Sequence, residues 1–209
     1  MKITVFGATD ILGKYIVREA IALNNEVYAF GRNVFTSGLQ RLENIHLLQG
    51  TLFDEDQVYN ALKDSDAVIV VINPPTDEFD KSRSLGIKNI LKQMHKAGKS
   101  RLIYVGSTAI LSDSSGKMLM ENPDFPKESF DQAREDLTVM QLLKESKLQW
   151  TYIALPSVKD EEVTGLYKSS TEFIEAQNSL DVKAGDAGLF ILNELNKNEN
   201  VNSVVMVYN

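Results

Sequence analysis

Two glycines six residues apart follow the first apolar run of the chain. Residues 2–6 lead directly into Gly7-Ala8-Thr9-Asp10-Ile11-Leu12-Gly13, and apolar positions at helical spacing continue as far as Leu23. Glycines in such a strand–turn–helix unit permit a tight turn, close approach of the backbone to a pyrophosphate, and close packing of helix on strand. The free N–H groups of the first helical turn and the helix dipole favour an anion at this point. The segment therefore predicts the phosphate-binding loop of a dinucleotide site.

Asp10 stands where a middle glycine is usual in loops of this kind. As an N-cap, its carboxylate would accept hydrogen bonds from the otherwise unpaired N–H groups of the helix, which is a purely structural role. The same carboxylate would lie near a bound pyrophosphate, where like charge lowers affinity. We expect a site that still binds a dinucleotide with Asp10 turned aside, and a weakened or lost site is the alternative.

The tip of the second apolar run carries a basic residue. Residues 26–30 are followed by Gly31-Arg32-Asn33, where a site for NAD(H) would need an Asp or Glu to accept from the ribose hydroxyls. Arg32 instead offers a planar fork of donors suited to the 2′-phosphate of NADP(H). A solvated surface arginine is the simpler alternative. We expect NADP(H) to be preferred over NAD(H).

The remaining elements repeat the alternation of short apolar runs with helical patterns. Strands alternating with helices predict βαβ units and a parallel sheet covered on both faces. We therefore expect one α/β domain over residues 1–209, a Rossmann-type doubly wound parallel sheet, with residues 160–179 as a small cap over the crevice. The expected strands are 2–6, 26–30, 45–48, 67–72, 102–105, 150–154 and 204–208; the expected helices are 11–23, 39–42, 56–63, 79–97, 127–146 and 186–196; and 112–126 is expected to be a loop.

The bulk composition excludes several classes of function. The 209 residues are 43% hydrophobic and 24% charged, with a formal net charge of -7, so no nucleic-acid partner is expected. The chain has no cysteine, which excludes disulfides, thiolate catalysis and Cys-ligated zinc. No apolar run approaches the length of a membrane span, and the N-terminus indicates a buried strand and not a signal peptide. We expect a cytoplasmic protein with no membrane association, as a monomer or homodimer.

The segments that follow the loop carry a family resemblance. Gly-Ala-Thr-x-x-x-Gly at residues 7–13 resembles the atypical short-chain dehydrogenase/reductases, in particular the NmrA-like and biliverdin-IX-beta-reductase-like group. The segments 122–126 (NPDFP), 148–152 (LQWTY) and 164–167 (TGLY) are similar to the NADH-flavin reductase-like proteins of bacteria, and the resemblance extends over essentially the whole chain.

The resemblance implies a small reductase in which NAD(P)H delivers hydride to a flavin or a similar flat acceptor. It also implies a place for particular residues along the cofactor. Thr9 to Leu12 (Thr9, Asp10, Ile11 and Leu12) would lie along the pyrophosphate, Arg32 at the adenosine ribose or its phosphate, Thr51 and Leu52 at the adenine, Ile72 and Asn73 at the ribose, and Ser107, Thr108, Pro156 and Ser157 beside the nicotinamide.

Three positions depart from the family pattern around one crevice. Asp10 replaces a glycine, Thr51 replaces an acidic residue that commonly follows the third strand, and Ala154-Leu155-Pro156 stands where Ser-Pro is usual. These departures bear on activity more than on fold.

Residues for acid–base or metal chemistry are sparse. A Tyr-x-x-x-Lys pair, in which the lysine lowers the pKa of the tyrosine, occurs only as Tyr59 to Lys63; this lies before the fourth strand, so Tyr59 is expected to be a packing residue. His46 and His95 are expected in a strand and near a helix end, which argues against a metal pair or a serine triad. Ser107 is the candidate catalytic residue: it either hydrogen-bonds a nicotinamide amide or substrate carbonyl, or merely caps the turn.

Two hypotheses of function follow. The first is a reductase that acts by positioning, because hydride chemistry belongs to the cofactor and the protein sets distance, angle and dryness. A flavin acceptor can take its proton from water, and Phe125 and Tyr167 are candidate apolar walls for it. The second is a non-catalytic NADP(H)-binding sensor of the NmrA-like type that binds protein partners, which Asp10 and the lack of an acid–base pair favour.

Overall fold

Strands alternate with helices along most of the chain and assemble into one central sheet. The computed structural model describes residues 1–72, 81–172 and 180–209. Within these residues, eight strands join in the order β3-β2-β1-β4-β5-β6-β10-β8, and β7 pairs separately with β9. The strands are β1 (Lys2–Phe6), β2 (Glu26–Gly31), β3 (Ile45–Gln49), β4 (Ala67–Val71), β5 (Arg101–Ser107), β6 (Gln149–Leu155), β7 (Ser157–Lys159), β8 (Lys168–Ser170), β9 (Asp181–Lys183) and β10 (Ser203–Tyr208).

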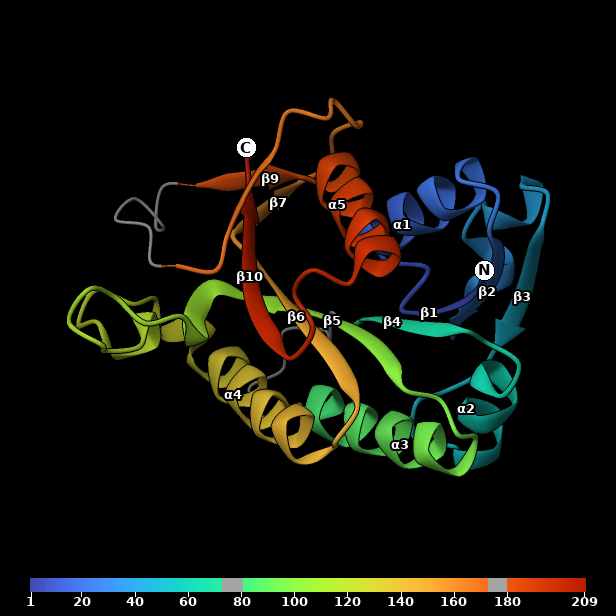
Figure 1. Ribbon diagram of the computed structural model, residues 1–209, viewed down its shortest axis with the longest axis horizontal. Helices are drawn as coiled ribbons and strands as arrows, with labels where there is room; N and C mark the ends of the chain where they lie inside the picture. Colours follow the sequence, from blue (N-terminus) through green and yellow to red (C-terminus); the bar gives the residue numbers. More distant parts are fainter. Residues whose placement is uncertain (73–80, 173–179) are drawn as a thin grey trace.

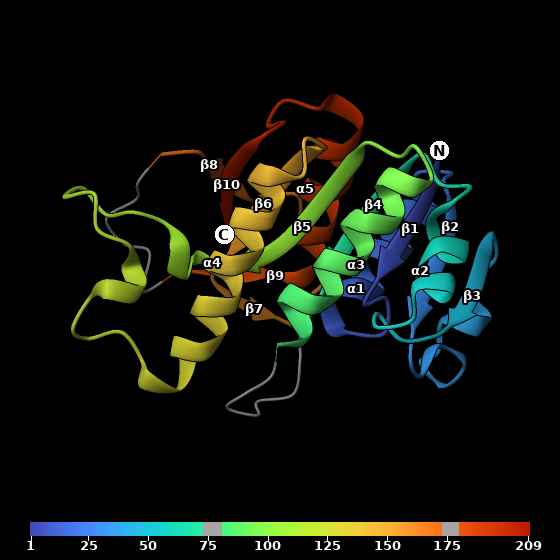
Figure 2. The ribbon, with the colours of Figure 1, turned by 90° about the horizontal axis from the view of Figure 1, so that it is seen from below.

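Helices cover both faces of this sheet. Figure 1 shows α1 and α5 on one face and α2, α3 and α4 on the other, and Figure 2 shows α2, α3 and α4 side by side across their face. The helices are α1 (Ile11–Ala22), α2 (Glu55–Leu62), α3 (Ser82–Lys96), α4 (Phe130–Glu145) and α5 (Ala184–Lys197), and the short 3-10 helices are η1 (Val34–Thr36), η2 (Leu39–Arg41), η3 (Thr108–Ile110), η4 (Leu119–Glu121) and η5 (Lys127–Ser129).

The strands of the sheet run parallel from β3 to β10, and β8 joins β10 antiparallel. The chain crosses from one half of the sheet to the other between β3 and β4, so the strand order reverses between β1 and β4. In open α/β sheets, ligands bind outside the carboxyl ends of the strands at such a reversal. The predicted Rossmann-type doubly wound sheet is confirmed.

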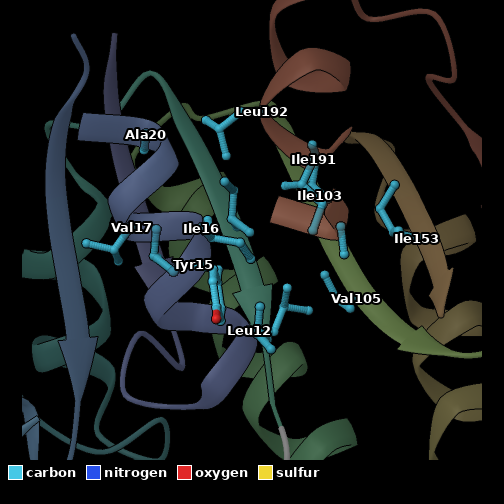
Figure 3. Close-up of a cluster of buried hydrophobic side chains, with 14 of the residues drawn as sticks. Leu12, Tyr15, Ile16, Val17, Ala20, Ile103, Val105, Ile153, Ile191 and Leu192 are labelled. Atoms are coloured by element: carbon cyan, nitrogen blue, oxygen red, sulfur yellow. The ribbon is translucent and has the colours of Figure 1, made fainter. Parts of the chain in front are cut away.

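Alternate residues of the central strands belong to two separate cores. On β5, Ile103 and Val105 face α1 and α5, whereas Leu102 and Tyr104 face the other three helices, as the two-residue period of a strand requires. Every residue of β4 is buried, which is typical of a central parallel strand covered on both sides. Figure 3 shows the first core, in which side chains of α1, α5, β5 and β6 meet.

Within the described residues, the predicted elements agree with the observed ones apart from a few local differences, and residues 79–80 of the expected helix 79–97 lie outside that part of the chain. In the segment 39–42, residues Leu39–Arg41 form only a short 3-10 helix, η2, because so short a segment cannot repay the cost of nucleating an α-helix. The three short strands β7, β8 and β9 were not predicted, since three residues carry no detectable period. In the part of the chain that the structure describes, no helix is both long and apolar enough to cross a membrane.

The described part of the predicted cap lies against α5 and the sheet edge. The side chain of Asp186 on α5 accepts hydrogen bonds from the Thr164 hydroxyl (2.6 Å) and from the N–H groups of Thr164 and Gly165 (2.7 Å each). The chain then continues into β8 beside β10. Residues 173–179 of the predicted cap lie outside the described residues.

Candidate functional site

Two adjoining pockets open at the carboxyl ends of the parallel strands. The larger has a volume of about 580 Å³ and lies over the ends of β4, β5 and β6. The smaller, of about 310 Å³, lies over the ends of β1, β2 and β3. Asp10, Val71 and Ile72 border both. Together the pockets form a continuous crevice across the point where the strand order reverses.

The turn between β1 and α1 forms the bridge between the two pockets. Gly7 has a φ of +83°, and a Cβ at this position would lie 1.7 Å from the carbonyl oxygen of Val71. A Cβ on Gly13 would lie 2.1 Å from the carbonyl oxygen of Gly7. Both positions therefore require glycine, the first for its left-handed backbone and the second for close packing of α1. This is the arrangement that a pyrophosphate needs in order to approach the backbone.

Asp10 occupies the N-cap position of α1 but does not cap it. Its carbonyl oxygen accepts from the N–H of Lys14 at 3.0 Å, whereas its side chain makes no capping hydrogen bond. The interpretation of Asp10 as a side-chain cap is therefore wrong. The first N–H groups of a helix have no partner within the helix, and the Asp10 side chain does not provide one for α1. This first turn begins at the border of both pockets.

The smaller pocket contains the residues expected at the adenosine half of a dinucleotide. Arg32, Thr51 and Leu52 line it, as do Gly7 and Phe53. Thr9, which was expected along the pyrophosphate, lines the same pocket. The loop after β3 is fixed at two points: the N–H of Thr51 donates to Gln57 Oε1 at 2.9 Å, and Asn89 Nδ2 donates to the Leu52 carbonyl at 2.8 Å. Phe53, which is 59% exposed, was not anticipated, because an exposed aromatic in a loop has no distinguishing sequence pattern.

The larger pocket contains the residues expected beside the nicotinamide. Ser107 and Thr108 after β5 and Pro156 and Ser157 after β6 all line it, and Phe125 and Pro126 form part of its wall. Ile11 and Leu12 at the start of α1, which were expected along the pyrophosphate, line the same pocket. Tyr167, expected as a second wall, lies instead against α5: its ring packs on Phe190 at 5.6 Å between centroids, and its hydroxyl accepts from Asn193.

The other predicted residues lie at or beyond the margin of the crevice. Gly13 supports the turn from behind, and the exposed Asn33 borders neither pocket. Asn73 lies outside the described residues. Tyr59 lies on α2 with Lys96 Nζ 4.5 Å from the centre of its ring, remote from the end of β5. In the described ranges, no cluster of three or more His, Asp or Glu side chains could hold a metal ion.

A buried polar network supports the larger pocket from behind. The carboxylate of Asp136 on α4 is fully buried and accepts from Arg83 Nη1 (2.7 Å), the Tyr104 hydroxyl (3.2 Å), and both the N–H (3.0 Å) and the hydroxyl (2.6 Å) of Ser107. The Tyr152 hydroxyl donates to the Ser107 carbonyl at 3.2 Å. The network thus fixes the end of β5 at the edge of the pocket.

The charges of this network are internally balanced. Burial lowers the pKa of Arg83, but the Asp136 carboxylate together with Tyr104 and Tyr152 outweighs burial, and the pKa ends above its ordinary value. Burial raises the pKa of both Tyr104 and Tyr152 well above the ordinary range, and Asp136 adds to the effect. The two tyrosines therefore keep their protons and act as hydrogen-bond donors.

Sequence reasoning did not identify Arg83 and Asp136 as site residues, although a weak signal exists. Arg83 stands one helical turn before the buried Ile87, and Asp136 stands between the buried Ala133 and Met140. Charged residues at core-facing positions of two helices indicate a buried ion pair. Which charge meets which cannot be deduced from helical spacing alone.

Comparisons with known proteins give a consistent family assignment. A family model described as NAD(P)H-binding matches residues 7–198. The protein YwnB of Bacillus subtilis (strain 168), whose function is uncharacterised, is 27% identical over 97% of this chain and 95% of its own length.

Solved structures share the whole fold. SP1627 of Streptococcus pneumoniae TIGR4, which carries the provisional name NADH-flavin reductase, superposes with a TM-score of 0.85 at 24% identity, over 100% of this chain and 99% of its own. A Bacteroides thetaiotaomicron protein provisionally named an epimerase gives a TM-score of 0.86 at 21% identity, over 99% and 96% of the two chains. At these identities the likeness shows the fold alone.

Proposed function

The chain belongs to the NAD(P)H-binding family of atypical short-chain dehydrogenase/reductases, and from this premise we propose that it is an NADP(H)-dependent reductase of a flat acceptor such as a flavin. The observation that carries the proposal is the pair of joined pockets on either side of Asp10, Val71 and Ile72. One pocket suits the adenosine half of a dinucleotide. The other has a volume within the range of small-molecule sites.

The preference for NADP(H) rests on Arg32. This exposed side chain borders the smaller pocket at the end of β2, and no ion pair to it is formed within the described residues. A guanidinium without a carboxylate partner is available to a 2′-phosphate, with which it can form paired hydrogen bonds.

The chemistry assigned to the chain is positioning and exclusion of water. When bound, NADPH supplies a hydride to the acceptor, which takes one further proton from water to complete a two-electron reduction. Ile11, Leu12, Phe125 and Pro126 provide apolar surface along the larger pocket, which favours stacked flat rings and removes water between them. The tyrosines behind the pocket are buried and retain their protons, so neither is assigned the role of an acid.

A second candidate function is a non-catalytic NADP(H) sensor. It is favoured by the Asp10 carboxylate at the border of both pockets, which opposes a pyrophosphate. It is also favoured by Gln132 on α4, which borders the larger pocket and whose amide has no acid–base capacity. The two functions share a binding site and differ in turnover.

One pair of measurements separates these functions. The purified protein is titrated with NADPH and with NADH by fluorescence, and oxidation of NADPH is then followed with and without added riboflavin or FMN. Flavin-dependent oxidation above the rate of a protein-free mixture supports the reductase. Saturable binding of NADPH without turnover supports the sensor, and the absence of dinucleotide binding contradicts both.

A further inference from the structure

The hydroxyl of Ser107 lies at the edge of the larger pocket, and its proton is already used in a hydrogen bond to Asp136. Ser107 is half-buried, borders the pocket, and donates from Oγ to Oδ2 of Asp136 at 2.6 Å. Its N–H donates to the same carboxylate oxygen at 3.0 Å. Both donors of this residue therefore point away from the pocket and into the protein.

Asp136 is placed so that it can only accept. Arg83 and Tyr104 donate to its Oδ1, while Ser107 occupies Oδ2. The carboxylate is fully buried and forms an ion pair with a guanidinium that is itself only 4% exposed. An ionised carboxylate has no proton to give, so the direction of the hydrogen bond from Ser107 is fixed.

What Ser107 leaves for the pocket is a lone pair. Its carbonyl oxygen accepts from Tyr152, and one lone pair of Oγ receives the N–H of Ala109 in a long contact of 3.4 Å. A hydroxyl has two lone pairs, so one acceptor site remains. We infer that Asp136 fixes Ser107 as a hydrogen-bond acceptor toward the pocket, and that Ser107 selects a ligand presenting an amide- or imide-type N–H.

This inference deepens the proposed function and rests on it for the two ligands that could carry such a group. One is the carboxamide N–H of the nicotinamide ring. The other is the imide N–H of the isoalloxazine ring of a flavin. In either case Ser107 orients the ring through a bond that it accepts, and it does not protonate the acceptor. Asp136, which touches neither ligand, is a positioning residue.

The first experiment compares ligands with and without the N–H. Binding of lumiflavin and 3-methyllumiflavin, and separately of NADPH and its 3-acetylpyridine analogue, is measured by fluorescence for the wild type and for Ser107→Ala. One lost hydrogen bond corresponds to about tenfold in affinity. In the wild type we expect about tenfold preference for the N–H form in one of the two pairs, and that pair identifies the source. In Ser107→Ala the same preference disappears.

Ser129→Ala is the matched control, because Ser129 borders the same pocket and no hydrogen bond from its hydroxyl to Asp136 is formed. This control is expected to retain the wild-type ratio between the two ligands of each pair. This control separates the effect of added space on the methylated ligand from the effect of hydrogen bonding. Both variants remove a hydroxyl at the pocket, but only Ser107→Ala removes the one whose proton is held by Asp136.

The second experiment reverses the direction of the bond. In Asp136→Asn the amide oxygen is expected to remain on the side of the Arg83 guanidinium and Tyr104. The amide N–H then donates to Ser107 Oγ and frees the hydroxyl proton for the pocket, and the hydrogen bond from the Ser107 N–H is lost. The preference for the N–H ligand is then lost although Ser107 is intact. If this variant unfolds because Arg83 loses its counter-ion, Arg83→Gln/Asp136→Asn keeps the pair uncharged and serves in its place.

The outcomes distinguish the inference from the proposed function. Flavin turnover with equal binding within both ligand pairs overturns the inference and leaves the reductase standing. Ligand preference that depends on Ser107, without turnover, supports the inference and contradicts the reductase. A preference that persists in Ser107→Ala, or no binding of any of the four ligands, also overturns the inference.

Discussion

The backbone of Gly7 lies so close to the carbonyl oxygen of Val71 that a Cβ on Gly7 would stand 1.7 Å from that atom. This contact joins the β1–α1 turn to the end of β4, where both pockets have their common border. The turn and the floor of the crevice are consequently in direct contact, and the geometry of the proposed pyrophosphate site depends on a residue without a side chain.

Gly7→Ala is expected to destabilise the protein and to abolish dinucleotide binding. The alanine must adopt a φ of +83°, which costs about 1–2 kcal/mol, and its methyl group must push β4 away. Gly38→Ala is the matched control, since Gly38 has a φ of +89° with nothing within 4 Å of an added Cβ. Urea unfolding of both variants measures the difference, and equal losses of stability would show that the Gly7–Val71 contact carries no weight.

Replacement of Arg32 by alanine is expected to erase the preference for NADPH over NADH. Loss of one charge-assisted hydrogen bond costs on the order of 1.5–3 kcal/mol, and only the 2′-phosphate of NADPH can make it. Affinities for both dinucleotides are measured by fluorescence titration, with Arg41→Ala, a change at another exposed arginine that borders neither pocket, as the control. Equal affinities for NADPH and NADH in the wild type would contradict the assignment at once.

Asp10→Gly is expected to strengthen dinucleotide binding by removing a carboxylate beside the pyrophosphate. Stability should change little, because the Asp10 side chain makes no capping bond. Asp54 provides the contrast: its carboxylate does cap α2, accepting from the N–H of Gln57 at 2.9 Å, so Asp54→Ala should cost about 1 kcal/mol.

Asp10→Asn separates charge from shape in this test. If repulsion is the cause, Asn and Gly variants both bind NADPH more tightly than the wild type, and the gain shrinks as salt is added. A fall in affinity for both variants would mean instead that Asp10 organises the loop.

The sheet and the phosphate loop could be predicted because their signals are local. Residues 67–71 are a continuous apolar run, and the spacing from Gly7 to Gly13 fixes a turn and a helix start within seven residues. The Arg83–Asp136 pair could not be predicted, because its partners are 53 residues apart on different helices. The position of the Tyr167 side chain was predicted wrongly for a related reason. An aromatic residue in a loop packs wherever the tertiary fold provides an apolar surface, and here that surface is Phe190.

Acid is expected to destabilise the anchorage of residues 164–165 on α5. Burial would raise the pKa of Asp186, but hydrogen bonds from Thr164, Asn209 and the N–H of Gly165 outweigh it and hold the pKa below its ordinary value. A depressed folded pKa contributes stability that is present above the unfolded value of about 3.9 and is lost as the pH falls through the folded pKa.

Asp186→Asn tests this dependence. Its stability deficit relative to the wild type should be largest near neutral pH and should shrink toward pH values below about 4. Urea unfolding across this range measures it, with Asp124→Asn, a change in an exposed loop, as the control. A deficit that is independent of pH would mean that shape and not charge is responsible.

Ser107→Leu is expected to abolish acceptor reduction while NADPH binding through the adenosine half largely persists. Ser107 borders only the larger pocket, whereas Arg32 and Thr51 border only the smaller one, so a bulky side chain at the end of β5 fills the proposed acceptor site and leaves the adenosine contacts in place. The substitution also removes the hydrogen bond from the Ser107 hydroxyl to buried Asp136, while the N–H of residue 107 is retained, and a loss of about 1–3 kcal/mol in stability is expected. Thermal unfolding therefore accompanies the assay, and Ser107→Ala, which loses the same hydroxyl without adding bulk, shows how much of the effect is steric.

Ser115→Leu, the same exchange in an exposed loop outside both pockets, should retain full turnover. If Ser107→Leu folds, binds NADPH and reduces flavin at the wild-type rate, the acceptor does not bind at the end of β5, and the mechanism proposed for the larger pocket fails with it.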